Sequence, residues 1–452
     1  MIDVGALCVG MFVHLDLSWM AHPFPLGSFK ISSAAQIETI GTLGLKRLRW
    51  SPNQSDVVAT ATGSWAPRAG NATGALDGPD AAAPTGSAFE PNEAVEATEA
   101  TEPAEPAVTP EVAAVAARQA HKRAIADQRA ALALCERQFT EASHDFKRLN
   151  DLVVSKPQEA RAQAEALSKA LVDKMLGERD MCVRLLTDAA GDKASMHAMN
   201  VTIIALLMGR TFGLSEPDMQ DLGVGAMLHD IGKIDLPERV RHRDDSLSAS
   251  ELRFYEEHVA HGVNMARKMG LTPGAMLVLA QHHEHADGSG FPLRLNTDRM
   301  TAGARIVSLV NRYDNLCNPH FVARAFTPHE SLSLMFAQGK SKFDTAILGA
   351  FIRMMGVYPA GSTVQLTDDR YAMVVGVNSS RPLKPRVLVH ERGVPRDEAL
   401  IVDLEAAQGV GIRRSIRPQQ LPVESLEYLA PRPRVAYFFE PLRVDEEASL
   451  AA

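Results

Sequence analysis

Seven of the fifteen histidines in this chain fall between residues 229 and 285. They include the pair His229-Asp230, then His258, and then the pair His282-His283. Imidazole nitrogen and carboxylate oxygen together suit borderline first-row ions such as iron, manganese or zinc. A carboxylate directly beside a histidine can also lie between two cations. The clustering therefore predicts a metal site.

His197 joins this set because it lies at the beginning of an apolar helical stretch, Met196 to Met208, where an imidazole needs a partner. The predicted ligands, in chain order, are His197, His229, Asp230, His258, His282 and His283. Two divalent ions that share Asp230 and a water would account for this number of ligands. Two cations make a shared water a nucleophile near neutral pH and neutralise phosphate oxygens, so the set predicts phosphoryl-transfer chemistry.

Two cationic side chains are candidates for binding a substrate phosphate. Lys233 follows Asp230 by three residues and is placed to contact a phosphate oxygen or assist the leaving oxygen; a solvated lysine after a helix end fits equally well. Arg305 lies in an apolar helical stretch. It is either an anion clamp or an arginine that stabilises the fold through a buried carboxylate.

A tight loop is expected directly after the second histidine pair. Residues 287–292 read Asp-Gly-Ser-Gly-Phe-Pro, and two glycines with a proline favour a reproducible turn. Beside the histidines, we interpret Gly290, Phe291 and Pro292 as a rim that shapes the substrate site.

Length and charge limit the class of protein. A chain of 452 residues exceeds what one core usually organises, so several domains are expected. No stretch approaches the roughly 18 apolar residues that span a bilayer, and the start lacks the basic segment of a signal peptide, which predicts a cytoplasmic protein without membrane contact. The net charge of -8 argues against a nucleic-acid polymer as partner, and is compatible with a small anionic substrate.

The chain is predicted to be mainly α, with five parts. Residues 1–55 form a small α/β or β-rich domain, with strands at Leu7–Val9 and Met11–Leu15 and a helix at Ala34–Leu43. Residues 56–110, rich in Ala, Pro and Glu, form a disordered linker, because glutamates recur every third residue between 90 and 105 without a basic residue.

Residues 111–189 are predicted to be a helical arm, with one helix from Glu111 to Val153 and a second from Pro157 past Leu186. The arm could form a coiled-coil homodimer or dock against the next domain. Residues 190–357 are predicted to be a helical bundle. Residues 358–440 form a β-rich appendage, with strands at Thr363–Leu366, Tyr371–Val377 and Arg386–Val389.

These motifs resemble the HD-GYP family, a branch of the HD metal-dependent phosphohydrolases whose members hydrolyse cyclic di-GMP. The resemblance covers residues 190–357 and rests on residues 229–233 (His-Asp-Ile-Gly-Lys), on His258 with Gly262, and on residues 282–284 (His-His-Glu) with the 287–292 loop. The first fifty residues resemble the small domain of unknown function that often precedes it. The resemblance implies an HD-type bundle, two divalent ions, iron or manganese, a cyclic dinucleotide substrate and signalling proteins as candidate partners.

Some positions depart from the family pattern. The next metal-binding aspartate falls on Asn311, whose amide oxygen can coordinate a cation but carries no charge; Asp314, one turn on, is the candidate to compensate. A glutamate that binds a third metal in some members corresponds to Lys193, so at most two metals are expected. Phe291 replaces the signature tyrosine, and His320 stands near the position of a phosphate-binding arginine.

Two functions follow from the resemblance and its departures. The first is a metal-dependent cyclic di-GMP phosphodiesterase in which Asp230 and Lys233 are the catalytic residues and Asn311 is a further metal ligand. The second is a catalytically degenerate module that keeps the fold and binds nucleotide or partner proteins without turnover, as Asn311 and His320 suggest. A phosphohydrolase that acts on a different nucleotide is a third reading.

Overall fold

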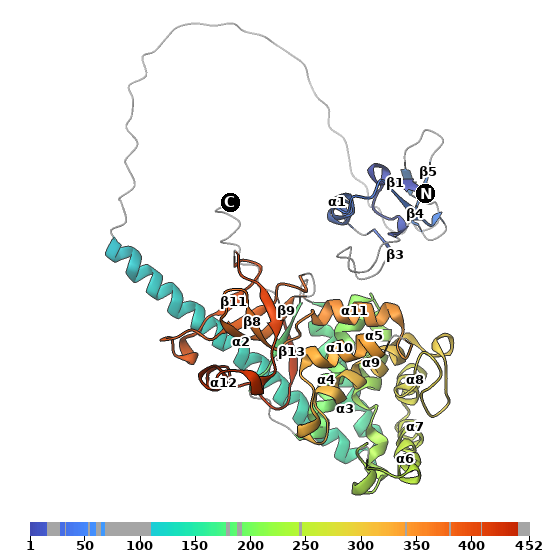
Figure 1. Cartoon of the computed structure of the whole chain (residues 1–452). Helices are drawn as coiled ribbons and strands as arrows, with labels where there is room; N and C mark the ends of the chain where they lie inside the picture. The colour runs from blue at the N-terminus through green and yellow to red at the C-terminus, as the bar shows by residue number, and fades with distance from the viewer. Residues whose placement is uncertain are drawn as a thin grey trace, which may run out of the picture. The chain divides into compact units, whose positions relative to one another are not determined.

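The computed structural model of this chain describes residues 1–15, 28–31, 33–52, 55–59, 65–67, 110–177, 181–187, 192–243, 246–339, 341–378, 381–407 and 409–441. It divides into two compact units, residues 1–121 and 122–452 (Figure 1). The predicted disordered linker falls mainly on residues 68–109, which lie outside the described residues. None of the helices in the described ranges combines the length and the hydropathy needed to cross a membrane.

The first unit holds a four-stranded antiparallel sheet in the order β1-β4-β2-β3 and one helix. The elements are β1 (Ile2–Asp3), β2 (Phe12–His14), β3 (Ser28–Lys30), β4 (Arg47–Trp50) and α1 (Ala34–Thr42). The predicted helix is confirmed, whereas the strand expected at Leu7–Val9 is wrong, because Val4–Ala6 forms a 3-10 turn that leads out of β1. Val57–Ala59 (β5) pairs with Trp65–Pro67 (β6), so the start of the predicted linker holds two paired strands.

The second unit contains a helical bundle around the apolar helix α4 (Figure 1). Its helices are α2 (Pro110–Leu152), α3 (Pro157–Leu176), α4 (Lys193–Thr211), α5 (Glu216–Met227), α6 (Ala249–Glu256), α7 (His258–Met269), α8 (Pro273–Gln281), α9 (Ala302–Cys317), α10 (Pro328–Gln338) and α11 (Thr345–Met355). Helix α4 contacts α3, α5, α9 and α11, which explains why it is apolar on all sides. Ser215 caps α5, since its side chain accepts from the Asp218 amide.

A seven-stranded sheet packs beside this bundle, with one strand from before the bundle in the sequence and six from after it. Its strands follow the order β11-β10-β9-β7-β13, with β8 between β9 and β12. They are β7 (Met181–Leu185), β8 (Thr363–Leu366), β9 (Tyr371–Asn378), β10 (Arg386–Val389), β11 (Ile401–Asp403), β12 (Ile412–Ser415) and β13 (Tyr437–Pro441). The three strands predicted in the appendage are confirmed. A helix running past Leu186 is wrong: α3 ends at Leu176, and β7 is an inner strand that pairs with β9 and β13.

Candidate metal centre

Four histidines are held in one tautomer by hydrogen bonds behind their rings. The Nδ1 atoms of His229, His258 and His282 lie 2.6, 2.5 and 2.7 Å from the backbone carbonyl oxygen three residues earlier. A carbonyl only accepts, so Nδ1 carries the hydrogen in each ring. The Nδ1 atom of His197 lies 2.6 Å from the Asp314 carboxylate. Each ring therefore presents Nε2, with its lone pair, toward the same point.

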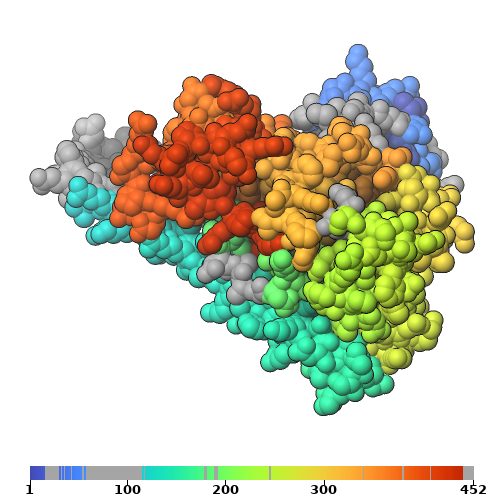
Figure 2. All heavy atoms as spheres, turned by 60° about the horizontal axis from the view of Figure 1, so that its bottom comes forward, coloured from blue at the N-terminus to red at the C-terminus, as the bar shows by residue number. Residues whose placement is uncertain are grey.

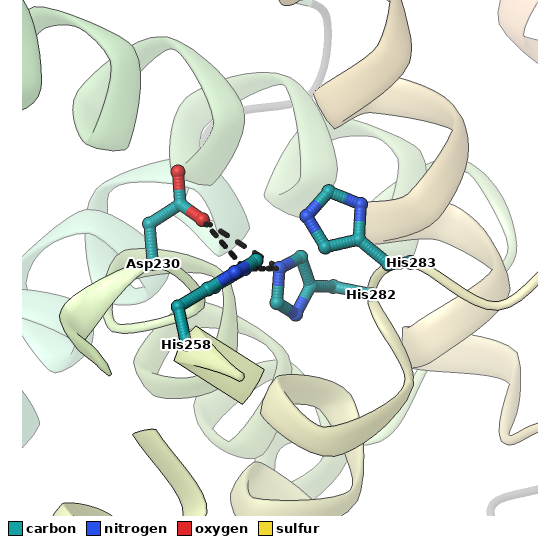
Figure 3. Close-up of side chains that lie close together, drawn as sticks. All are labelled: Asp230, His258, His282 and His283. Atoms are coloured by element: carbon teal, nitrogen blue, oxygen red, sulfur yellow. Dashed lines mark hydrogen bonds and ion pairs between the residues drawn. The ribbon is translucent and has the colours of Figure 1, made fainter. Parts of the chain in front are cut away.

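Asp230 lies at that point, between two pairs of rings. Its Oδ2 atom is 3.6 Å from His197 Nε2 and 3.4 Å from His229 Nε2. Its Oδ1 atom is 3.5 Å from His258 Nε2 and 3.6 Å from His282 Nε2. We call His197, His229 and Asp230 Oδ2 the first half of the centre, and Asp230 Oδ1 with His258, His282 and His283 the second half. Figure 3 shows the second half, with the His283 ring beside that of His282.

The elements that bring these residues together come from four places in the bundle. His197 lies in α4, His229 and Asp230 follow α5, His258 is the first residue of α7, and the pair His282-His283 follows α8. Gly232, in the 3-10 turn η4 (Ile231–Asp235) after Asp230, allows this turn to pack on α7, because a Cβ there would lie 1.9 Å from the His258 carbonyl oxygen. No other residue type fits this contact without moving His258.

The donor atoms fit one divalent ion in each half. The Nε2 atoms of His197 and His229 are 3.1 Å apart, and those of His258 and His282 are 3.4 Å apart. Facing lone pairs repel unless a proton or cation lies near both. With metal–nitrogen bonds of about 2.1 Å, two donors at about 90–110° on one ion are separated by about 3.0–3.4 Å. In each half, one donor atom per residue can be chosen so that these atoms lie within 4.8 Å of one another.

Two buried atoms of the second half make no hydrogen bond to any described residue. They are Asp230 Oδ1 and His283 Nε2. A buried polar atom without a partner costs about 1–3 kcal/mol, and native structures retain few of them. A cation bound by both atoms would satisfy them. Both these two unsatisfied atoms and the chemistry of the donor groups therefore indicate that the second half can bind a metal ion.

The electrostatics keep the ligands in their binding forms at neutral pH. Burial lowers the pKa of His229 to about 4 and that of His258 to about 3, so both rings are neutral. Burial alone would raise the pKa of Asp230, but the charge of Lys233 holds it well below its usual range. Lys233 Nζ lies 2.6 Å from Asp230 Oδ2, and this carboxylate raises the pKa of Lys233 against the effect of burial.

Asp314 orients a ligand and does not compensate for Asn311. Its side chain is fully buried, and Oδ2 accepts from His197. Its Oδ1 accepts from the side-chain amides of Asn200 at 2.8 Å and Asn318 at 2.9 Å. Both oxygens are thus engaged behind the ring of His197. The expectation that Asp314 replaces the missing carboxylate as a ligand has to be corrected: it is the partner that fixes the tautomer of His197.

Three of the positions that depart from the family pattern lie in the walls around the centre. Asn311 is buried in α9, and its Oδ1 accepts from the Asn315 side chain at 2.6 Å. Lys193 begins α4 and donates to the His320 carbonyl oxygen at 3.4 Å. A cation thus stands where a third metal would require a carboxylate. The His320 ring stacks on that of His242, with centroids 4.0 Å apart.

The loop after His283 is fastened by a residue that sequence reasoning missed. Glu284 is fully buried, and its carboxylate accepts from the backbone amides of Leu293 at 2.6 Å and Leu295 at 2.8 Å. The signal for it was a charged residue directly between the ligand pair and the loop. Phe291 stacks on the His283 ring, with centroids 4.4 Å apart. A Cβ at Gly290 would lie about 2.4 Å from backbone at residue 285, so the loop requires glycine here.

Two cavities adjoin the centre. The first, of about 300 Å³, adjoins the first half and is lined by residues that include His197, Asp230, Lys233, Lys193, Arg241, Phe146 and Arg434. The second, of about 510 Å³, adjoins the second half and is lined by residues that include His282, His283, Asn311, Arg243, Arg312, Arg324 and Lys342. Both share Lys233, Asn315 and the stacked pair His242 and His320. Cationic side chains thus line both cavities.

The remaining predicted substrate contacts lie elsewhere. Gly290, Phe291 and Pro292 line neither of these two cavities, and Phe291 instead packs on a predicted ligand. Arg305 Nη1 donates to Asp344 at 2.8 Å, where Asp344 caps α11. This ion pair favours the alternative in which Arg305 stabilises the fold.

Comparison with known proteins identifies two domains. Residues 149–347 match the model of the HD domain, and residues 1–164 match the model of the domain of unknown function DUF3391. Together the two models span residues 1–347, which include every predicted metal ligand. The HD match begins in α2 and therefore reaches further toward the N-terminus than the 190–357 region of the resemblance.

Curated relatives match between 36% and 86% of this chain. Cyclic di-GMP phosphodiesterase PA4108 of Pseudomonas aeruginosa is 25% identical over 86% of this chain and 84% of its own length. Cyclic di-GMP phosphodiesterase PdeB of Borreliella burgdorferi is 21% identical over 52% of this chain and 62% of its own length. A 3'3'-cGAMP-specific phosphodiesterase of Vibrio cholerae is 26% identical over 36% of this chain and 31% of its own length.

Proposed function

We propose that this chain, an HD-domain protein of the HD-GYP type with an N-terminal DUF3391 domain, is a metal-dependent phosphodiesterase that hydrolyses cyclic di-GMP. The observation that carries the proposal is the carboxylate of Asp230 between two facing pairs of histidine nitrogens. The similarity to a cyclic di-GMP phosphodiesterase over most of both chains supports this substrate. The two cationic cavities that adjoin the centre suit a ligand with two phosphodiester groups.

Two divalent ions, iron or manganese, would be held by the residues of the first half and of the second half, with Asp230 common to both. When bound, such ions acidify a water and neutralise the oxygens of the reacting phosphate. Lys233 remains charged because Asp230 raises its pKa, and it faces both cavities. Its ammonium group lies 5.4 Å from the centre of the Tyr255 ring, so it is held on two sides and placed to contact a phosphate oxygen.

Turnover by metal-loaded protein tests the proposal. Purified protein reconstituted with manganese or iron is incubated with cyclic di-GMP, and the linear dinucleotide and GMP are separated by chromatography. We expect hydrolysis by the wild type and none by Asp230→Ala, with loss of both ions in the variant. Wild-type protein that holds both ions and yields no product would reject the phosphodiesterase.

The second candidate is a degenerate module that binds nucleotide or partner proteins without turnover. Asn311 favours it, since a neutral amide that is already hydrogen-bonded to Asn315 stands where the family pattern has a carboxylate. The variant Asn311→Asp separates the two candidates. If it creates hydrolysis in a protein that otherwise has none, the wild type is the degenerate case.

A homodimer through the helical arm is part of the proposal. Residues 118–124 of α2 are all exposed, and a contact between two arms is expected there. Light scattering coupled to size-exclusion chromatography tests this: a dimer of the full chain that Ala120→Arg dissociates would support it, and a monomer would reject it.

A further inference from the structure

We propose that Arg434, from the segment that enters β13, binds a phosphate group of the substrate in the first cavity, so that the C-terminal sheet completes the active site. This inference rests on the proposed cyclic dinucleotide substrate. Arg434 lines the same cavity as His197, Asp230 and Lys233, although it lies more than two hundred residues later in the chain. Figure 2 shows the red C-terminal segment set between the orange part of the molecule and the cyan and green helices.

The charge of Arg434 is not neutralised by its hydrogen bonds. Its guanidinium donates to two backbone carbonyl oxygens, that of Asn318 at 3.3 Å and that of His320 at 3.2 Å. Neither acceptor carries a charge, and no ion pair joins Arg434 to a carboxylate within the described part of the chain. Burial lowers the pKa of Arg434, and the nearby Asp314 only partly opposes this effect. A half-buried cation held by neutral groups is suited to bind an anion.

The other charged side chains of the first cavity do not neutralise the charge of Arg434. Among the described residues of the wall, Asp230 is the only carboxylate, and it already pairs with Lys233 at 2.6 Å. Arg241 pairs with Glu238 at 2.8 Å, outside the wall. Lys193 adds a further cation whose hydrogen bond goes to a carbonyl. The cavity therefore carries an excess of positive charge beside the reacting centre, which a phosphodiester group would balance.

The backbone beside Arg434 is fixed to the same residues that orient His197. The Val435 amide donates to Asn318 Oδ1 at 2.9 Å, and the Val435 carbonyl accepts from Asn200 at 3.0 Å and Asn318 at 2.9 Å. Both of these asparagines also donate to Asp314 Oδ1. The position of Arg434 relative to the first half is therefore set by buried hydrogen bonds, as a preorganised binding residue requires.

The test separates a phosphate contact from a role in holding the 318–320 turn. Arg434→Met and Arg434→Lys are compared with wild type and with Arg432→Met, a control at an exposed arginine on the same segment. For the manganese-loaded proteins, kcat, KM for cyclic di-GMP, metal content and melting temperature are measured. We expect Arg434→Met to raise KM about tenfold to a hundredfold with kcat and metal content little changed, since hydrogen bonds to charged groups have this strength. Arg434→Lys should recover part of the loss, and Arg432→Met should behave as wild type.

Other outcomes overturn the proposal. An unchanged KM in Arg434→Met would do so, as would equal losses of metal and melting temperature in both Arg434 variants, which indicate a structural role. Calorimetry of cyclic di-GMP binding to the same proteins distinguishes a failure of this proposal from a failure of the proposed function. Binding by wild type without hydrolysis rejects the phosphodiesterase, while a tenfold weaker affinity of Arg434→Met still supports the phosphate contact. A wild type that neither binds nor hydrolyses rejects both.

Discussion

The two halves of the metal centre present the same ring nitrogen but reach it by different routes. In the second half, His258 and His282 are oriented by carbonyl oxygens only three residues away, so the ends of two helices suffice. In the first half, His197 is oriented by Asp314, which is 117 residues away in the chain. His229 of the first half is oriented locally as well, by the carbonyl oxygen of Ala226. The orientation of His258 and His282 is thus a property of local backbone, whereas that of His197 exists only when distant elements have assembled.

The first half is also tied to the C-terminal sheet. Asn200 and Asn318 each join Asp314 to the backbone of the segment that enters β13, and the Tyr437 amide donates to Asn200 at 3.0 Å. The fully buried Asn200 uses both ends of its amide in this way. A disturbance of the sheet should therefore reach His197 before it reaches His258. Four experiments test this difference between the two halves.

Removing one histidine from each half should produce the largest effect. We expect His229→Ala and His258→Ala each to retain one ion where the wild type holds two, and to lose hydrolysis by about 10³-fold, because each ion contributes several kcal/mol to stabilising the charge of the transition state. Metal analysis of the purified variants and a turnover assay measure this. Loss of both ions from either variant would mean that the halves do not bind independently.

Removing the carboxylate behind His197 should weaken the first half alone. Asp314→Asn keeps the shape and removes the charge, and loss of such an orienting partner typically costs 10–100-fold in metal affinity. Manganese titration should then show one weakened site and one unchanged site. If both sites weaken equally, the two halves are coupled through Asp230 more strongly than their separate hydrogen bonds indicate.

The same difference explains which parts of the site could be predicted from the sequence. His229, Asp230, His258, His282 and His283 stand in recognisable local motifs, and the structure brings them together around Asp230. The second half requires only that these local helix ends meet. Their role as ligands stays a prediction until metal is measured.

The contacts of the first half were harder to foresee. Asp314 and Asn200 carry no local signature, because their function depends on partners more than a hundred residues away. The strand at Met181–Leu185 was not predicted for the same reason, because its neighbours β9 and β13 lie near the other end of the chain. The HD-type bundle was predictable because its motifs and its helical patterns agree. Arg434 could not be foreseen, since nothing in its own segment indicates a cavity.

Removing the carboxylate of Glu284 should affect the second half through its loop. Glu284→Gln leaves the amides of Leu293 and Leu295 with a single oxygen acceptor and a poorly placed amide group. We expect a loss of about 1–3 kcal/mol in the free energy of unfolding. Urea denaturation measures this, with Asp298→Asn, an exposed carboxylate in the same loop region, as the control. Manganese affinity of the first half should stay the same, and a change there would contradict the local character of this loop.

A further expected effect concerns the protonation of the buried histidines, and it should be the same in both halves. Burial lowers the pKa of His229 to about 4 and of His258 to about 3, whereas both titrate near 6.5 in the unfolded chain. Between these values the unfolded state binds a proton that the folded state does not. Their contribution to stability is therefore complete above about pH 6.5 and is lost as the pH falls toward 4, at about 1.4 kcal/mol per pH unit for each histidine.

Urea unfolding of the metal-free protein at pH 7.5, 6 and 5 measures this dependence. The neutral replacements His229→Asn and His258→Asn should each flatten the dependence on pH below 6.5 by about one proton, whatever their effect on stability at pH 7.5. Equal flattening would show that burial alone keeps the rings neutral, regardless of how each half is oriented. If only one variant flattens the curve, the ring in the other half is already protonated in the folded metal-free protein. Its facing nitrogens would then share that proton until a metal displaces it.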